Sequence, residues 1–468
     1  MLCFPVLRKT VTTAARKSHA AMLVVVALLA AIGFSWEIVQ ANGGLGWDGV
    51  AYAELARRPG PVNTYYASRI LPSLIVSLFV PVDADNAQLI AAFRALNLLC
   101  VFGSLILWAR ISNALQLRSG RWIGFFGLFL SFQAAKQFYY YPILTDSFAM
   151  LCAMAMLVCQ LEHRRIALFA LTIIASFAWP TASLVGAALL CCPTGDDTPK
   201  KLVGLPIAAA TLAVSILLVL VLHLAGGPGR ALATALPSYV LIAIAAWTLL
   251  YWPPRFLLAG LTALVIPWLI IRLIASDIPG GGTPAMLVDY VLYPQAGKFL
   301  LPFVSLGAYW GPVFVLACVY WSRVSAVARA TAMAPAILVS MPFILTTEPR
   351  HFTFAWPFLV ACVAKALDNW PRHSLIVLAA WTLFWSQFWL PINYAPWSPG
   401  TADLQQFPKQ IWYMHFGFWM HWTTYFAQGF LLLITAFTLS RRRLDHGKAD
   451  HNRLRQSRSR HVPDADQR

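Results

Sequence analysis

The sequence predicts an all-α fold, a polytopic transmembrane helical bundle of about 12–14 hydrophobic segments. Composition is the first observation, because 59% of the 468 residues are hydrophobic and only 11% are charged. Periodic apolar runs are the second. Runs of about 20 residues, the length at which a helix crosses a hydrocarbon core of roughly 30 Å, recur from Ala20 to Leu439. The third is that basic residues gather between these runs, as the positive-inside rule predicts.

Residues 1–440 therefore form one predicted membrane domain, in which residues 40–66 make a first external loop with short interfacial helices. The segment from Ala20 to Trp36 resembles a signal peptide. It lacks a small-residue cleavage site and many more segments follow it, so we expect it to be the first helix. The predicted segments lie near residues 20–39, 69–82, 87–109, 122–135, 143–160, 166–192, 202–224, 237–252, 255–276, 299–321, 327–346, 351–367, 373–391 and 423–439.

The net charge of +17 would suggest a nucleic-acid partner in a soluble protein. Here the charge lies at the ends of the predicted helices, so we expect no nucleic acid and a multi-pass membrane protein. Arg16 and Lys17 precede the first segment and Arg441 begins the tail, which places both termini in the cytoplasm. The basic tail, residues 441–468, is expected to be disordered and to lie near anionic membrane lipid.

The same rule assigns sides to the loops. Counting back from the C-terminus puts 365–373 inside and 346–351 outside, and places Asp48 and Asp146 on one external face. Counting forward from the N-terminus conflicts with this between Pro81 and Ala87. Either 69–82 is re-entrant, or a neighbouring predicted segment does not cross.

Asp48 is the most informative residue, since it follows the first apolar segment at once, within the glycine-rich run 42–49. A carboxylate at the water edge of a membrane protein is by default a candidate functional residue. The alternative is a solvated Asp that caps a short helix starting near Gly49.

Several short motifs around Asp48 resemble those of one family. Trp47-Asp48-Gly49 is followed by Tyr52, by Tyr65-Tyr66, by Arg69-Ile70-Leu71-Pro72 and by Thr145-Asp146. Over residues 40–150, with a further similarity at Glu348-Pro349-Arg350-His351, the chain resembles the GT-C superfamily of polytopic membrane glycosyltransferases. The resemblance implies a catalytic Asp in the first external loop and a second acid in a later one. It also implies a polyprenyl-phosphate sugar donor used at the extracytoplasmic face of the bacterial inner (plasma) membrane.

The chemistry of such a transfer assigns a role to each candidate residue. A carboxylate takes the proton of the acceptor hydroxyl or stabilises positive charge, which fits Asp48 and Asp146. The leaving lipid phosphate requires cations, for which Arg69, Arg350 and Lys136 are the candidates. The alternatives are that these cations snorkel to headgroups and that Asp146 is only a helix N-terminal acid.

Aromatic and polar neighbours complete the predicted substrate pocket. Aromatic rings can stack on a sugar or a prenyl chain, although they are also typical of an interfacial belt. The pocket is expected to contain Trp47, Tyr52, Tyr66, Tyr141, Glu348 and His351.

The sequence thus predicts a hexosyl- or pentosyltransferase that moves a sugar from a polyprenyl-phosphate carrier to a lipid- or surface-linked glycan acceptor. The alternatives are a transporter or flippase of polysaccharide or lipid-linked sugar, and a non-catalytic membrane assembly subunit. A transporter would place paired acids and bases in mid-segment. No cofactor and no metal site is required, although a divalent cation bridging Asp48, Asp146 and the phosphate is compatible with the sequence. Eight scattered cysteines indicate neither disulfides nor a metal cluster.

Overall fold

The computed structural model describes residues 13–35, 38–192, 229–249, 256–275, 298–346, 348–389, 420 and 422–459. This part of the chain is all-helical, as predicted, and has no β-strand beyond one isolated bridge between Val62 and Ala275. The predicted segment 202–224 lies outside the described residues.

Short helices build the N-terminal third after the first long helix. In chain order the elements are α1 (Thr13–Ser35), the 3-10 turn η1 (Ala41–Gly44), α2 (Asp48–Arg57), α3 (Thr64–Ala67), α4 (Ile70–Ser77), α5 (Asn86–Ala114), α6 (Gly120–Phe129), the π-helical turn η2 (Gln133–Gln137), α7 (Phe138–Tyr140) and α8 (Asp146–Leu161). The remaining elements are α9 (Arg165–Ala175), α10 (Ala182–Cys191), α12 (Gly229–Leu249), α13 (Leu257–Ile274), α15 (Leu301–Trp310), α16 (Pro312–Val319), α17 (Trp321–Ala330), α18 (Ala334–Ser340), η5 (Met341–Thr346), η6 (Pro349–Phe352), α19 (Trp356–Ala366), α20 (Arg372–Trp385) and α21 (Trp422–Ser459).

Several of these helices could span a membrane. By length and composition, four described stretches qualify: Arg16–Ser35, α5, α13 and Trp422–Ser440. Counting α16 and α17, which meet at a bend of 86°, as one broken span makes five. A further six apolar helices have 10–17 residues, so they are shorter than a straight crossing requires. The described residues therefore contain fewer long single helices than the 12–14 hydrophobic segments that the sequence predicts.

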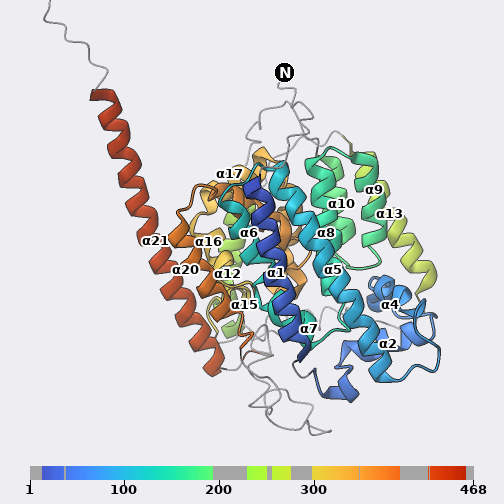
Figure 1. Cartoon of the computed structure of the whole chain (residues 1–468). Helices are drawn as coiled ribbons and strands as arrows, with labels where there is room; N and C mark the ends of the chain where they lie inside the picture. The colour runs from blue at the N-terminus through green and yellow to red at the C-terminus, as the bar shows by residue number, and fades with distance from the viewer. Residues whose placement is uncertain are drawn as a thin grey trace, which may run out of the picture.

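The segment 69–82 is the clearest difference. Its helix α4 has eight residues, a length of about 12 Å, and Figure 1 shows it beside α2 at one end of the molecule. The Leu71 N–H donates to the Phe177 carbonyl, which ties α4 to the break between α9 and α10. A helix this short does not cross a membrane. If residues 69–82 do not cross, the loop sides counted forward from the N-terminus agree with those counted back from the C-terminus.

Other predicted segments are interrupted. In the segment 122–135, helix α6 ends at Phe129 and the π-helical turn η2 follows. The segment 299–321 breaks at Gly311, whose φ is 70°. Glycine adopts such a positive φ at little energetic cost, whereas other residues are strained there. The segment 166–192 breaks between α9 and α10 at Trp179-Pro180-Thr181, where the sequence indicates an interruption.

Helix α21 runs from Trp422 to Ser459, and the disordered basic tail expected from residue 441 stays a prediction. Extending an existing helix needs no new nucleus, and Arg, Leu, Lys and Ala are good helix formers. Residues 460–468 lie outside the described part.

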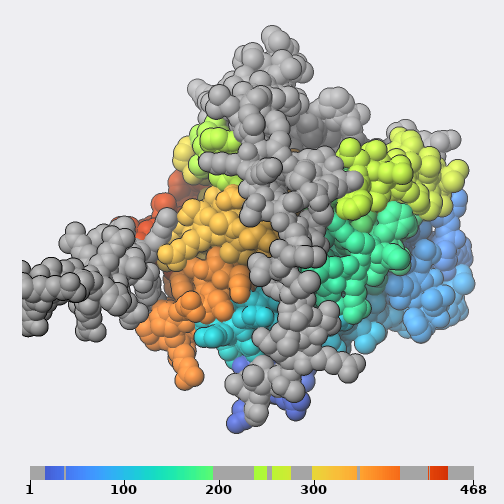
Figure 2. Space-filling model, turned by 90° about the horizontal axis from the view of Figure 1, so that it is seen from above, coloured from blue at the N-terminus to red at the C-terminus, as the bar shows by residue number. Residues whose placement is uncertain are grey.

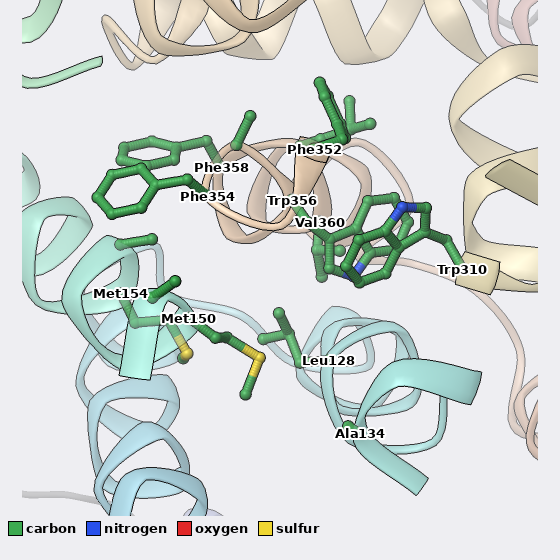
Figure 3. Packing of buried hydrophobic residues seen from close by; sticks show 14 of the residues in the cluster. Leu128, Ala134, Met150, Met154, Trp310, Phe352, Phe354, Trp356, Phe358 and Val360 are labelled. Atoms are coloured by element: carbon green, nitrogen blue, oxygen red, sulfur yellow. The ribbon is translucent and has the colours of Figure 1, made fainter. Parts of the chain in front are cut away.

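The core is aromatic and connects α6, α8, α15 and α19. The indoles of Trp310 and Trp356 stack with ring centroids 4.5 Å apart, beside Met150 and Leu128 (Figure 3). The Trp356 Nε1–H donates to the Gly127 carbonyl at 2.9 Å. This packing fixes the start of α19, and with it the loop 348–355 that precedes the helix.

The helices define two ends of the molecule. In Figure 1, α1 begins and α21 ends on one side, while α2, α4 and α7 lie on the other. Viewed from the side of the termini, α13 lies at the rim beside α9 and α10 (Figure 2). Asp48 begins α2 and Asp146 begins α8, just after α7, so both belong to the end opposite the termini. The loop before α19 lies there as well, because its Arg350 contacts Asp48.

Candidate functional site

Arg350 joins two carboxylates at this end of the molecule. Its Nη2 lies 2.8 Å from Asp48 Oδ2, and its Nε donates to Glu348 Oε1. The three side chains are between 14% and 25% exposed, so the ion pairs are largely removed from solvent. One guanidinium is shared by two acids that lie about 300 residues apart in the sequence.

Asp48 is held by the turn that precedes α2. Gly46 has a φ of 69°, and a Cβ there would overlap the ring of Tyr141. The Tyr141 hydroxyl in turn accepts a hydrogen bond from the Gly49 N–H at 3.2 Å. The N-cap of α2 is Trp47 and has no side-chain cap, so Asp48 points to Arg350 rather than capping the helix, the alternative that the sequence left open.

Tyr65 extends the cluster on the other side of Asp48. Its hydroxyl donates to Asp48 Oδ2 at 3.5 Å, and its ring packs edge-on against Tyr66. The guanidinium of Arg69 lies 3.9 Å from the centroid of the Tyr65 ring and 5.2 Å from that of Trp179. Arg69 is 4% exposed, so this cation is enclosed by aromatic rings.

Asp146 lies deeper, at the first residue of α8, and is 1% exposed. Its Oδ1 accepts from Gln133 Nε2 at 3.4 Å, whereas its Oδ2 has no hydrogen-bond partner among the described residues. Gln133 Nε2 also donates to Thr353 Oγ1 at 2.6 Å, three residues after Arg350. Asp146 is thus connected through Gln133 to the loop that carries Arg350.

Gln133 and Thr353 were not among the predicted site residues. The signal for Gln133 was an amide within an otherwise apolar run, since a polar group there needs a buried partner. Thr353 gives no comparable signal, because threonine is common in apolar helices and loops.

Nearby charges lower the pKa values of the two acids that pair with Arg350, and burial lowers the pKa of His351. Burial opposes ionisation of Asp48, but the adjacent Arg350 and Arg69 outweigh burial and lower the pKa of its carboxyl. Glu348 behaves alike, as Arg350 and His351 overcome burial and lower its pKa. Burial lowers the pKa of His351 from 6.5 to about 4. Near pH 7 the acids are therefore ionised and His351 is neutral, 3.6 Å from Glu348.

The other predicted residues are placed as follows. Tyr52 is buried and packs edge-on against Tyr66, so both line the back of the cluster. Trp47 is 37% exposed at its edge. Tyr141 braces the Asp48 turn through its hydroxyl, a supporting role that the sequence did not predict.

Lys136, the third predicted cation, is buried in the π-helical turn η2. No group of three or more His, Cys, Asp or Glu side chains in the described part of the chain could hold a metal ion.

Comparison with known proteins gives no relative: no family model, no curated protein and no solved structure matches the chain. The function is consequently argued from the geometry and chemistry of the cluster.

Proposed function

We propose that the chain is a multi-pass bacterial inner-membrane glycosyltransferase that moves a sugar from a polyprenyl-phosphate carrier to a lipid- or surface-linked acceptor. The proposal includes membrane insertion with both termini cytoplasmic and with the Asp48 end outside. The observation that carries it is the half-buried Asp48–Arg350–Glu348 cluster at one end of an apolar helical bundle, with the buried acid Asp146 beneath it.

The cluster has the groups that the reaction needs. In the transfer, the acceptor oxygen bonds to the anomeric carbon, the bond from that carbon to the phosphate oxygen breaks, and the phosphate leaves with the electron pair. The acceptor proton passes to the ionised carboxylate of Asp48. Arg350 and Arg69 stabilise the charge of the leaving phosphate.

Arg350 has a free donor for this purpose. Its Nε and Nη2 bind the two acids, while Nη1 makes no hydrogen bond with a described residue. A phosphate bound at Nη1 would draw the guanidinium from Asp48. Asp48 would then be a stronger base when the donor is bound, since its low pKa depends on Arg350.

A transporter is the weaker alternative on the same evidence. The ion pairs among the described residues lie at helix ends and in loops. Transport pathways more often place paired charges in mid-membrane, on broken helices.

The test is Asp48→Asn, which keeps the size of the side chain and removes the base. Transfer from a polyprenyl-phosphate sugar by the reconstituted, folded variant should fall by at least about a hundredfold. Asp83→Asn is the control, because Asp83 is an exposed acid near the start of α5, at the same end of the molecule. If Asp48→Asn transferred as well as Asp83→Asn, the catalytic assignment would be lost.

A further inference from the structure

Asn97 is a buried amide in the apolar helix α5, and it binds a single segment of the chain. Its side chain is 3% exposed. Its Nδ2 donates to the Phe138 carbonyl at 3.0 Å and to the Pro142 carbonyl at 2.8 Å, and its Oδ1 accepts from the Ser147 hydroxyl. A polar side chain inside a predicted membrane segment is costly and by default a candidate functional residue.

The backbone of this segment needs a donor from elsewhere in the fold. In a continuous helix the Phe138 carbonyl would accept from the N–H of the fourth residue on, but that residue is Pro142, which has no N–H. Asn97 supplies the missing donor. Only one orientation of its amide can do so, since the opposite orientation would turn an oxygen toward two carbonyl oxygens.

The segment that Asn97 holds supports Asp48. Tyr141 lies between the two carbonyls that Asn97 binds, and its hydroxyl accepts from the Gly49 N–H at 3.2 Å. Its ring also lies against Gly46. A shift of the segment would therefore move the turn that carries Asp48.

The same segment leads to Asp146. Ser147, which donates to Asn97 Oδ1, directly follows Asp146 at the start of α8. The three hydrogen bonds of one amide thus hold residues 138–147 near both ends of this interval.

We infer that Asn97 is a positioning residue for the sugar transfer, which fixes the segment 138–147 and through it the placement of Asp48 and Asp146. This inference rests on the proposed function, to which it adds a residue that acts without touching the substrate. Hydrogen bonds between helices in a bilayer are individually weak, so the three bonds contribute little to folding. Their effect is geometric, because a misplacement of about 1 Å in a catalytic site lowers the rate on the order of a hundredfold.

The experiment measures transfer kinetics of the reconstituted full chain. Asn97→Leu keeps a similar side-chain size and removes the three hydrogen bonds, so kcat should fall at least about tenfold. KM for the donor should stay within about twofold, because the arginines proposed to bind the phosphate keep their contacts.

Gln160→Leu is the matched control. Gln160 is a buried amide on α8, at the end of the termini, and its Nε2 donates to the Ala332 carbonyl at 3.2 Å. Its replacement should lower the thermal midpoint about as much as Asn97→Leu does and leave kcat unchanged. Equal kcat values for the two variants would overturn the inference.

A double-mutant cycle tests the route through Tyr141. If Asn97 acts by holding Tyr141, adding Tyr141→Phe to Asn97→Leu should lower kcat by less than about twofold further. Losses that multiply would overturn the route from Asn97 to Asp48.

Ser147→Ala keeps the inference testable if Asn97→Leu does not fold. It removes one hydrogen bond to Asn97 and leaves the two carbonyls bound, so kcat should fall about threefold. Its control is Ser104→Ala, since Ser104 is buried on α5 and its hydroxyl has no hydrogen-bond partner among the described residues. Equal kcat values for this pair would also overturn the inference.

Failure of this inference is separable from failure of the proposed function, because hydrogen exchange does not depend on catalysis. The Gly49 N–H should exchange faster in Asn97→Leu than in Gln160→Leu. If this difference were seen while Asp48→Asn transferred sugar normally, the proposed function would fail and the link from Asn97 to the Asp48 turn would stand. If Asp48→Asn lost transfer while Asn97→Leu kept the kcat of Gln160→Leu, the positioning role alone would fail.

Discussion

The two ends of the helical bundle use charge in different ways. At the end of the termini, Arg110 and Arg164 both pair with Glu162, and the two arginines are 45% and 60% exposed. Asp368 there accepts hydrogen bonds from the backbone N–H groups of Arg118 and Gly120, which joins the loop before α6 to the end of α19. Such exposed ion pairs and loop hydrogen bonds each contribute little to the stability of the fold.

At the other end, Arg350 is mostly buried and pairs with two acids. Among the described residues, the buried Arg69 forms no ion pair, and one carboxylate oxygen of Asp146 accepts no hydrogen bond. Burial of ionised groups is unfavourable unless each is paired. In this buried cluster one arginine pairs with two acids while another forms no ion pair, and that arrangement favours a ligand site. The exposed ion pairs at the end of the termini need no ligand to explain them.

The largest expected effect is the presence or absence of cysteine labelling, which reports the side of the membrane that each end of the bundle faces. In a background without native cysteines, Val50→Cys at the Asp48 end should react with an impermeant thiol reagent from outside intact cells. Arg164→Cys, at the end of the termini, should react only after the membrane is opened. Both positions are exposed, so access to solvent is matched. Labelling of both from the same side would contradict the proposed orientation.

The next effect compares one arginine from each end. Arg350→Ala leaves Asp48 and Glu348 unpaired and removes a phosphate ligand, so transfer should fall by about a hundredfold or more. Arg350→Lys keeps the positive charge but loses the bidentate hydrogen-bonding geometry of the guanidinium, so it should retain partial activity. Arg110→Ala breaks an exposed pair and should change the free energy of unfolding by less than about 1 kcal/mol and leave transfer unchanged.

If Arg350→Ala transferred sugar with the kinetics of Arg110→Ala, Arg350 would be a headgroup anchor. Measuring KM for the donor separately from kcat would then show whether any loss lies in donor binding. A change in thermal stability alone would not support the phosphate role.

A smaller effect is expected from the brace behind Asp48. Tyr141→Phe removes the hydroxyl that accepts from the Gly49 N–H and leaves the ring against Gly46. Loss of one buried hydrogen bond costs about 1 kcal/mol, so transfer should fall about fivefold. Tyr139→Phe is the control, because Tyr139 packs against Phe34, away from the acids. Equal rates for the two variants would argue against a role for Tyr141 in placing Asp48.

The smallest effect is on stability at acid pH. The folded-state pKa of His351 is about 4, below its ordinary 6.5, so between these values the unfolded chain binds a proton that the folded chain does not. Stability should therefore decrease as the pH falls from 6.5 to 4. Asp48 and Glu348, whose pKa values are lowered, should add a further loss below about pH 4.

Thermal midpoints measured against pH test this. His351→Gln should flatten the decrease between pH 6.5 and 4, and His373→Gln, exposed at the other end, should not. An unchanged slope in His351→Gln would show that this histidine does not titrate as its burial implies.

The sequence by itself determined the helical class, the apolar segments, the interruption near Pro180 and the unusual position of Asp48. These follow from composition, periodicity and the nature of neighbouring residues, which are local properties of the chain. It also identified Glu348 and Arg350 as charges at a helix mouth, although it could not say which acid Arg350 would bind.

Only the tertiary structure decided the rest. The pairing of Arg350 with Asp48 and the link from Gln133 to Thr353 depend on which helices pack side by side, and the hydropathy of the sequence does not encode that packing. The same holds for α4, where an apolar run long enough to be predicted as a segment forms only two turns of helix, and the Leu71 N–H donates to the Phe177 carbonyl. Long-range packing of side chains, not local preference, selects these partners.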